Sequence, residues 1–169
     1  MTAVGQVKRA VAAAIKAAGC AAIESYSEEQ LKRYATAVAA VGTKEMVIEE
    51  SGAAQYLGEK VDEATQETVS VYGRKMLLTL LIEVYAPRTL GAAGCEKAAE
   101  VVTQALMTAL PEGLKLGSLQ WGKTGWDKTT GMFRLDASAK YAAYFVAEAA
   151  EDETVFTDFI LKGTVKERE

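Results

Sequence analysis

The chain has 169 residues and a formal net charge of −4; half of its residues are hydrophobic and a quarter are charged. This balance is typical of a globular domain, and the acidic surplus argues against sequence-specific DNA binding. The absence of histidine removes the commonest general base and most zinc chemistry. The two cysteines, Cys20 and Cys95, have no metal-knuckle spacing, so we expect reduced thiols. No apolar run is long enough to span a membrane.

Residues 1–19 are predicted to form an N-terminal amphipathic helix. Its apolar residues recur three or four positions apart at Val4, Val7, Val11 and Ile15. This spacing lines one helical face, and Gly19 is placed to end the helix. A short strand over Ala21–Tyr26 and a single helical turn over Ser27–Tyr34 are expected to follow.

Two strands, over Thr36–Thr43 and Glu45–Glu50, are predicted next. Ser51–Gln66 then turns polar and contains two glycines, so we expect an extended loop. Loops of this length in compact domains are usually functional or mobile. An arm or binding loop and an ordinary surface loop are both open at this point.

The middle of the chain predicts the core of a sheet and its cover. Val69–Tyr72 alternates like a strand, Gly73–Lys75 interrupts it, and Met76–Tyr85 is almost continuously apolar. The last segment is expected to be a central strand covered on both faces. Gly91–Leu110 has the longest helical pattern, and Pro111 follows to stop it.

The C-terminal part is predicted to be a run of strands. Apolar residues occupy every second position of Met132–Glu148, which predicts a long strand with one buried face and a bend or bulge near Ser138. Thr154–Val165 would be its antiparallel partner, and residues 166–169 a flexible tail. The chain therefore predicts a single α+β domain over 1–169, with a mainly antiparallel sheet covered by one long helix.

The stretch Gly117–Thr124, GSLQWGKT, fits the phosphate-loop pattern G-x-x-x-x-G-K-[ST]. A working phosphate loop needs a helix that begins at its Lys-Thr pair, so that the helix N-terminus faces the anion. The residues that follow contain the turn sequence Asp127–Gly131, which does not suit a helix start. We therefore expect a β-hairpin with limbs over Leu119–Trp126 and from Met132 onward.

Other polar and aromatic residues were weighed for chemistry. Trp121 and Trp126 would either cap the core or anchor a subunit interface. Glu83, inside the apolar strand, is expected to pair with a basic neighbour such as Arg134 or Lys140. The sequence offers no credible active site, so we expect a protein that is not an enzyme and needs no cofactor or metal.

Two segments carry a family resemblance. They are Leu81–Pro87, followed by Gly91 and a helix that contains Cys95, and Trp126–Arg134, which leads to Tyr141 and Phe145. With Tyr56–Gly58, their order and spacing over about Val41–Val165 resemble the tail-terminator, or tail-completion, proteins of tailed bacteriophages, especially those of Gram-positive hosts.

The resemblance implies a structural virion protein assembled in the host bacterial cytoplasm. Such a subunit forms a ring, usually a hexamer, that ends the tail tube and joins the tail to the head. Its partners would be its own copies, the tail tube protein and possibly the sheath, and the head-tail connector. DNA would pass through the acidic lumen without sequence-specific binding, and no membrane is involved.

Candidate residues for contacts between subunits or rings come from the long loop, the strand junction and the tryptophan-bearing hairpin. They are Tyr56, Leu57, Arg74, Lys75, Trp121, Trp126 and Lys128. A connector adaptor or stopper protein is an alternative within the same assembly. A nucleotide-binding domain built on Gly117–Thr124 is the alternative from another class, and an enzyme with a carboxylate pair has no support in the spacing.

Overall fold

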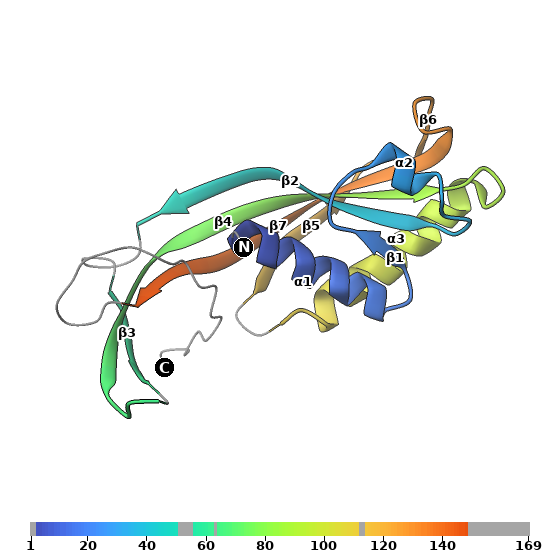
Figure 1. The fold of residues 1–169 in the computed structure, drawn as a ribbon. Coiled ribbons are helices and arrows are strands. Elements are labelled where there is room, and N and C mark those ends of the chain that lie inside the picture. Colours follow the sequence, from blue (N-terminus) through green and yellow to red (C-terminus); the bar gives the residue numbers. More distant parts are fainter. Residues whose placement is uncertain (1–2, 51–55, 63, 112–113, 149–169) are drawn as a thin grey trace.

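The computed structural model describes residues 3–50, 56–62, 64–111 and 114–148 (Figure 1). Within these ranges the chain forms three helices and seven strands. In chain order they are α1 (Ala3–Ala17), β1 (Ala21–Ile23), α2 (Glu28–Leu31), β2 (Val38–Glu49), β3 (Tyr56–Val61), β4 (Thr68–Ala86), α3 (Gly91–Thr108), β5 (Lys115–Trp121), β6 (Gly125–Asp127) and β7 (Met132–Glu148). The predicted strand over Thr154–Val165 and the tail 166–169 lie outside the described residues.

All seven strands belong to one sheet, in which β1, β2, β4, β7 and β5 lie in that order. β3 pairs with β4 and β6 pairs with β7. Every pairing is antiparallel except that of β1 with β2. The prediction of an α+β fold with a mainly antiparallel sheet is confirmed.

The central pair of strands, β4 and β7, forms the longest ladder in the sheet. The two strands stay in one register from Val71 opposite Glu148 to Ala86 opposite Phe133. The predicted bulge near Ser138 is therefore absent, because β7 follows β4 without a shift. The irregularities lie instead in the outer strands, between Thr43 and Glu45 of β2 and between Leu116 and Ser118 of β5.

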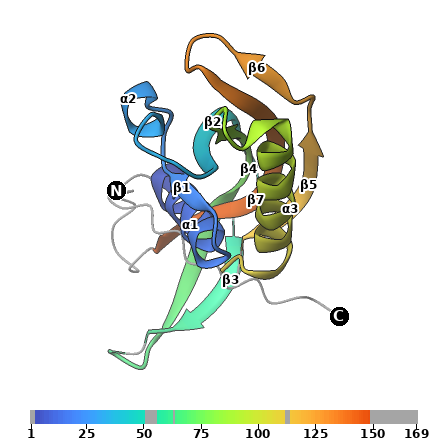
Figure 2. The same ribbon diagram turned by 90° about the vertical axis from the view of Figure 1, so that its right-hand side faces the viewer.

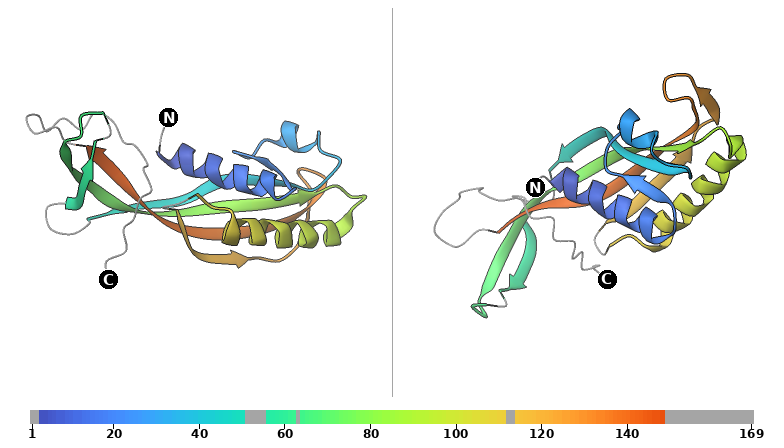
Figure 3. Two further views of the ribbon diagram at one scale, coloured as in Figure 1. Left: turned by 90° about the horizontal axis from the view of Figure 1, so that it is seen from below. Right: turned by 45° about the vertical axis from the view of Figure 1, so that its right-hand side comes forward.

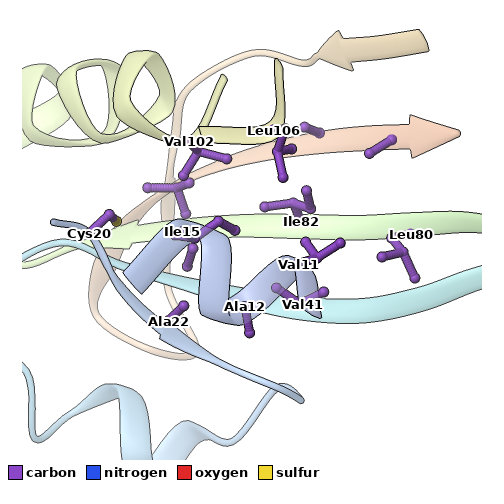
Figure 4. Packing of buried hydrophobic residues seen from close by; sticks show 14 of the residues in the cluster. Val11, Ala12, Ile15, Cys20, Ala22, Val41, Leu80, Ile82, Val102 and Leu106 are labelled. Atoms are coloured by element: carbon purple, nitrogen blue, oxygen red, sulfur yellow. The ribbon is translucent and has the colours of Figure 1, made fainter. Parts of the chain in front are cut away.

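Two helices, α1 and α3, cover the same face of the sheet (Figures 1 and 2). The close view in Figure 4 shows Val11 and Ile15 of α1 and Val102 of α3 around Ile82 of β4, and all four are fully buried. The prediction that one long helix covers the sheet is therefore only partly correct, because α1 shares that face with α3. The alanine-rich stripe of α1 is slim enough to share that face with α3.

The N-terminal helix forms as its apolar spacing predicts. Val7, Val11 and Ile15 are fully buried on one face, and the chain leaves the helix through Gly19 at φ +93°. Only glycine adopts this left-handed conformation without strain, which explains why α1 ends there.

Two predicted interruptions are absent. β2 runs through Lys44 with a local bulge instead of ending there. β4 continues through Gly73–Lys75, because these residues pair with Val146, Phe145 and Tyr144 of β7. Pairing with a long neighbouring strand outweighs the low strand propensity of a Gly-Arg-Lys sequence.

The predicted extended loop Ser51–Gln66 contains a strand. β3 occupies Tyr56–Val61 and pairs with β4 beyond the end of β2, on the same side of β4. A tight turn then leads back into β4: the Asp62 N–H donates to the Glu67 carbonyl at 2.9 Å and the Gln66 N–H to the Asp62 carbonyl at 2.8 Å. Residues 51–55 and 63 lie outside the described ranges.

Among the described residues, α2 and β1 cover the second face of the sheet at one end, so the prediction that β4 is buried on both faces is only partly correct. There α2 and β1 enclose a small core that includes Leu31, Val38 and Tyr85. Further along β4, Leu77 and Leu81 point to this face and are half-buried. The views in Figure 3 show no described helix over that part of the sheet.

Two adjacent residues of α3 test which face of the helix packs on the sheet. Leu106 is buried, whereas Met107 is 74% exposed. Leu106→Ala should lower the free energy of unfolding by about 2–5 kcal/mol, since it removes buried methyl groups and leaves a cavity. Met107→Ala should change it by no more than about 0.5 kcal/mol. Urea denaturation followed by circular dichroism measures both, and equal losses would contradict the assigned orientation of α3.

Candidate subunit interface

The sheet extends past the helices as an arm, which we define as residues 43–49 of β2, β3, residues 68–75 of β4 and residues 144–148 of β7. Figure 1 shows it projecting beyond α1 and α3, with β3 at its far end. The change is sharp in β2, where Val38–Val41 are buried and Thr43–Glu49 are exposed. The strands of the arm are joined by backbone pairing.

The arm exposes large apolar side chains. Met46, Val47 and Ile48 are 39–47% exposed, and at its far end Tyr56 and Val61 are 44% and 57% exposed. Consecutive strand residues point to opposite faces, so this surface lies on both sides of β2. A contiguous patch of exposed apolar residues on a protein surface commonly marks an interaction site.

Four of the predicted interface residues lie on this arm. The ring of Tyr56 meets that of Tyr72 edge-on, with centroids 5.7 Å apart, and Leu57 is half-buried at the β3 irregularity. Arg74 is exposed on β4. Lys75 is half-buried, with its Nζ 3.8 Å from Oε2 of a β2 glutamate, Glu49.

The other three predicted residues lie at the opposite end of the sheet. Trp121 is half-buried, and its indole N–H donates to Thr103 Oγ1 of α3 at 2.9 Å. Trp126 is 45% exposed and stacks edge-on against Phe133, with ring centroids 5.1 Å apart. Lys128 is exposed in the turn after β6. The structure therefore separates the seven residues into two groups, and Trp121 has a packing partner within the chain.

The phosphate-loop match forms no anion cradle. Within residues 114–148 no helix begins at Lys123, and β6 starts at Gly125 instead. The following turn is closed by Asp127, whose carboxylate accepts from the Thr130 hydroxyl at 2.8 Å and the Thr129 N–H at 3.0 Å. The Thr130 bond is the largest cause of a lowered Asp127 pKa. The predicted hairpin is confirmed, with its first limb divided into β5 and β6.

A charged network occupies the partly covered face of the sheet. Arg134 lies 2.7 Å from the Glu83 carboxylate and makes a two-pronged contact with Asp136 at 2.6 and 2.8 Å. The Tyr85 hydroxyl donates to Glu83 at 3.3 Å. Burial raises the pKa of Glu83, and the charge of Arg134 opposes that shift. Of the two basic neighbours predicted to pair with Glu83, Arg134 is the one that does so, and the network stabilises a buried carboxylate.

A second surface was not predicted from the sequence. A shallow groove of about 540 Å³ lies between α3 and β5, and its apolar lining includes Ala99, Met107, Trp121 and Leu135. No local motif signals it, because its walls come from three segments that meet only through the fold. Such a groove accepts an apolar side chain. Its lining also includes Glu96, Glu100, Thr103, Gln104 and Thr108.

Comparison with known proteins finds no matching family model and no matching curated protein. Within the described ranges, no cluster of acidic, cysteine or histidine side chains has the geometry to hold a metal ion. No helix in that part of the chain is long and apolar enough to cross a membrane. The arm, with Met46, Val47 and Ile48 exposed, is the candidate functional surface.

The buried network gives a test with a clear pH dependence. Arg134→Met removes the cation shared by Glu83 and Asp136 and leaves Glu83 with only the Tyr85 hydroxyl. It should cost about 1–3 kcal/mol, below the cost at a fully buried pair because the Arg134 side chain is 36% exposed. Loss of the cation raises the Glu83 pKa further. Because a raised folded-state pKa favours the protonated form, the part of the cost due to Glu83 should be smallest at acidic pH, where its carboxyl is protonated with or without Arg134, and should grow as pH rises.

The control is the double variant Arg134→Met/Glu83→Gln, which removes the carboxylate charge. It should recover most of the lost stability near neutral pH and little at acidic pH. Denaturant unfolding of both variants across pH 4–8 measures the difference. Parallel pH profiles would contradict a role for Glu83 as the group left unpaired.

Proposed function

We propose that this chain is a bacteriophage tail terminator, a structural protein whose copies form a ring at the end of the tail tube and join it to the head. The proposal rests on the resemblance carried by Leu81–Pro87 and Trp126–Arg134. The α+β fold with a mainly antiparallel sheet is compatible with it. The acidic net charge suits a lumen through which DNA slides without being held.

The observation that carries the proposal is the arm. A sheet that extends past its helices leaves backbone edges and apolar side chains in contact with water. Contacts between identical copies bury such a surface, and a head-to-tail contact with the correct rotation closes into a ring. In an isolated monomer the side chains of Met46, Val47 and Ile48 stay exposed to water, whereas in a ring a neighbouring subunit can bury them.

A connector adaptor or stopper remains the second candidate, because it would use the same arm in a neighbouring ring of the same particle. Nucleotide binding at Gly117–Thr124 lacks support, since β6 follows where the chemistry needs a helix N-terminus. Position in the particle separates the terminator from the adaptor: the terminator contacts the tube protein directly.

The purified chain should form a closed ring in solution, with six copies as the expected number. Sedimentation velocity and native mass spectrometry give the mass, and negative-stain class averages give the symmetry. A chain that stays monomeric at about 100 μM, a concentration well above most specific affinities, would contradict the proposal.

Loss of the chain should leave heads and tails unjoined and tail tubes of irregular length. Electron microscopy of particles from a phage or prophage lacking the coding sequence measures both features. Tubes of normal length that fail only to join heads would favour the adaptor or stopper instead.

A further inference from the structure

The two outer edges of the sheet lack a described partner along most of their length. β2 pairs with β1 only over Val38–Ala40, so from Val41 to Glu49 its outer edge faces no described strand. On the other side of the sheet, β7 is the strand that pairs with β5 within the described ranges. Backbone groups along such edges are ready to pair with another chain.

These two edges lie at the same level of the sheet. The pairings of β2 with β4, of β4 with β7 and of β7 with β5 show which residues of β2 and β5 lie in the same row across the sheet. The end rows are Val41–Ile82–Ala137–Trp121 and Val47–Leu77–Ala142–Lys115. Segment 41–47 is therefore level with segment 115–121, and a sideways step of one subunit brings one edge beside the other.

Strand direction also suits such a step. The neighbours β2, β4, β7 and β5 are each antiparallel to the next. β5 therefore runs opposite to β2, and a following copy in the same orientation presents its β2 antiparallel to this β5. Antiparallel pairing places side chains directly opposite one another and makes straight backbone hydrogen bonds.

We propose that the β2 edge of one copy, Val41–Glu49, pairs antiparallel with the β5 edge of the next copy, Lys115–Trp121. This inference specifies the contact within the ring proposed above and rests on it. The contact is head-to-tail, so each copy uses both edges and the assembly leaves neither edge exposed. It also places neighbouring protein over the apolar residues Met46, Val47 and Ile48.

The chemistry of the two edges differs in a complementary way. Along its exposed part β2 carries two glutamates, Glu45 and Glu49, against one lysine, Lys44. The proposed β5 edge, Lys115–Trp121, carries one lysine, Lys115, and no acidic residue. Opposite charge at the rim of a contact contributes to orientation and specificity more than to affinity.

Each edge also contains one irregularity, at Lys44 in β2 and at Gly117 in β5. Glu45, Thr79, Lys140 and Ser118 are paired in one row across the four strands. Lys44 lies next to this row on one side, and Gly117 lies next to it on the other. A bulge interrupts the ladder and blocks most registers of pairing. The edges are thus poorly suited to unspecific stacking and favour a defined contact.

Cysteine cross-linking between separately purified variants tests the pairing. Glu45→Cys and Ser118→Cys place one thiol on each proposed edge, and a bismaleimide reagent captures neighbouring thiols. The native Cys20 and Cys95 are buried, and burial raises the pKa of Cys95 to about 11, so they react slowly. We expect a covalent dimer in the mixture of the two variants and none in either variant alone.

Outcomes of the cross-linking separate the two proposals. The control mixture combines Glu45→Cys with Lys16→Cys, which places a thiol at an exposed position of α1. If the wild-type chain forms rings but the test mixture cross-links no better than this control, the edge pairing is wrong and the ring proposal stands. A dimer of Glu45→Cys alone would indicate β2–β2 contacts and also overturn it. A monomeric wild-type chain would overturn the ring itself.

A pair of charge insertions tests the same contact without cross-linking. Val47→Lys lies within the proposed edge, whereas Ala13→Lys is on α1, outside it, and both positions are exposed in the single chain. The first should weaken ring assembly about tenfold or more, since it buries an unpaired charge, and the second by less than about twofold. Sedimentation at several concentrations measures both, and equal effects would contradict the inference.

Discussion

The unbroken register between β4 and β7 is the constraint on which the rest of the structure depends. Because the two strands alternate in step over the whole ladder, one face of the sheet collects apolar side chains and receives α1 and α3. The ladder continues past the helices, where each backbone pair contributes only about 0.5–1.5 kcal/mol net. One shared ladder thus provides both the core and the uncovered arm.

Local patterns in the sequence predicted the parts of the fold that local physics decides. The spacing of Val7, Val11 and Ile15 gave α1, and the period of two in Met132–Glu148 gave β7. The Asp127–Gly131 turn was readable from its side-chain chemistry, and excluded a phosphate loop. That Glu83 has a basic partner was predicted because a carboxylate inside an apolar strand needs a cation nearby, but the sequence left Arg134 and Lys140 open.

The remainder depended on contacts between distant segments, which one sequence does not reveal. Gly73–Lys75 has the composition of a break but is held as a strand by β7, and β3 forms in a polar segment because β4 extends beyond β2. The apolar triplet Met46–Ile48 predicted a strand but not its exposure, since the end of the helical cover is a property of the assembled fold. The candidate contact residues therefore fell into two groups at opposite ends of the sheet.

The length of the β4–β7 ladder has a mechanical consequence. Its hydrogen bonds lie across the strands, so tension along the strand axis loads many of them together in shear. A force applied sideways at an edge would peel the same bonds apart one after another. The molecule is therefore stiffest along the long dimension of its ribbon, and a load carried in that direction is resisted by the whole ladder at once.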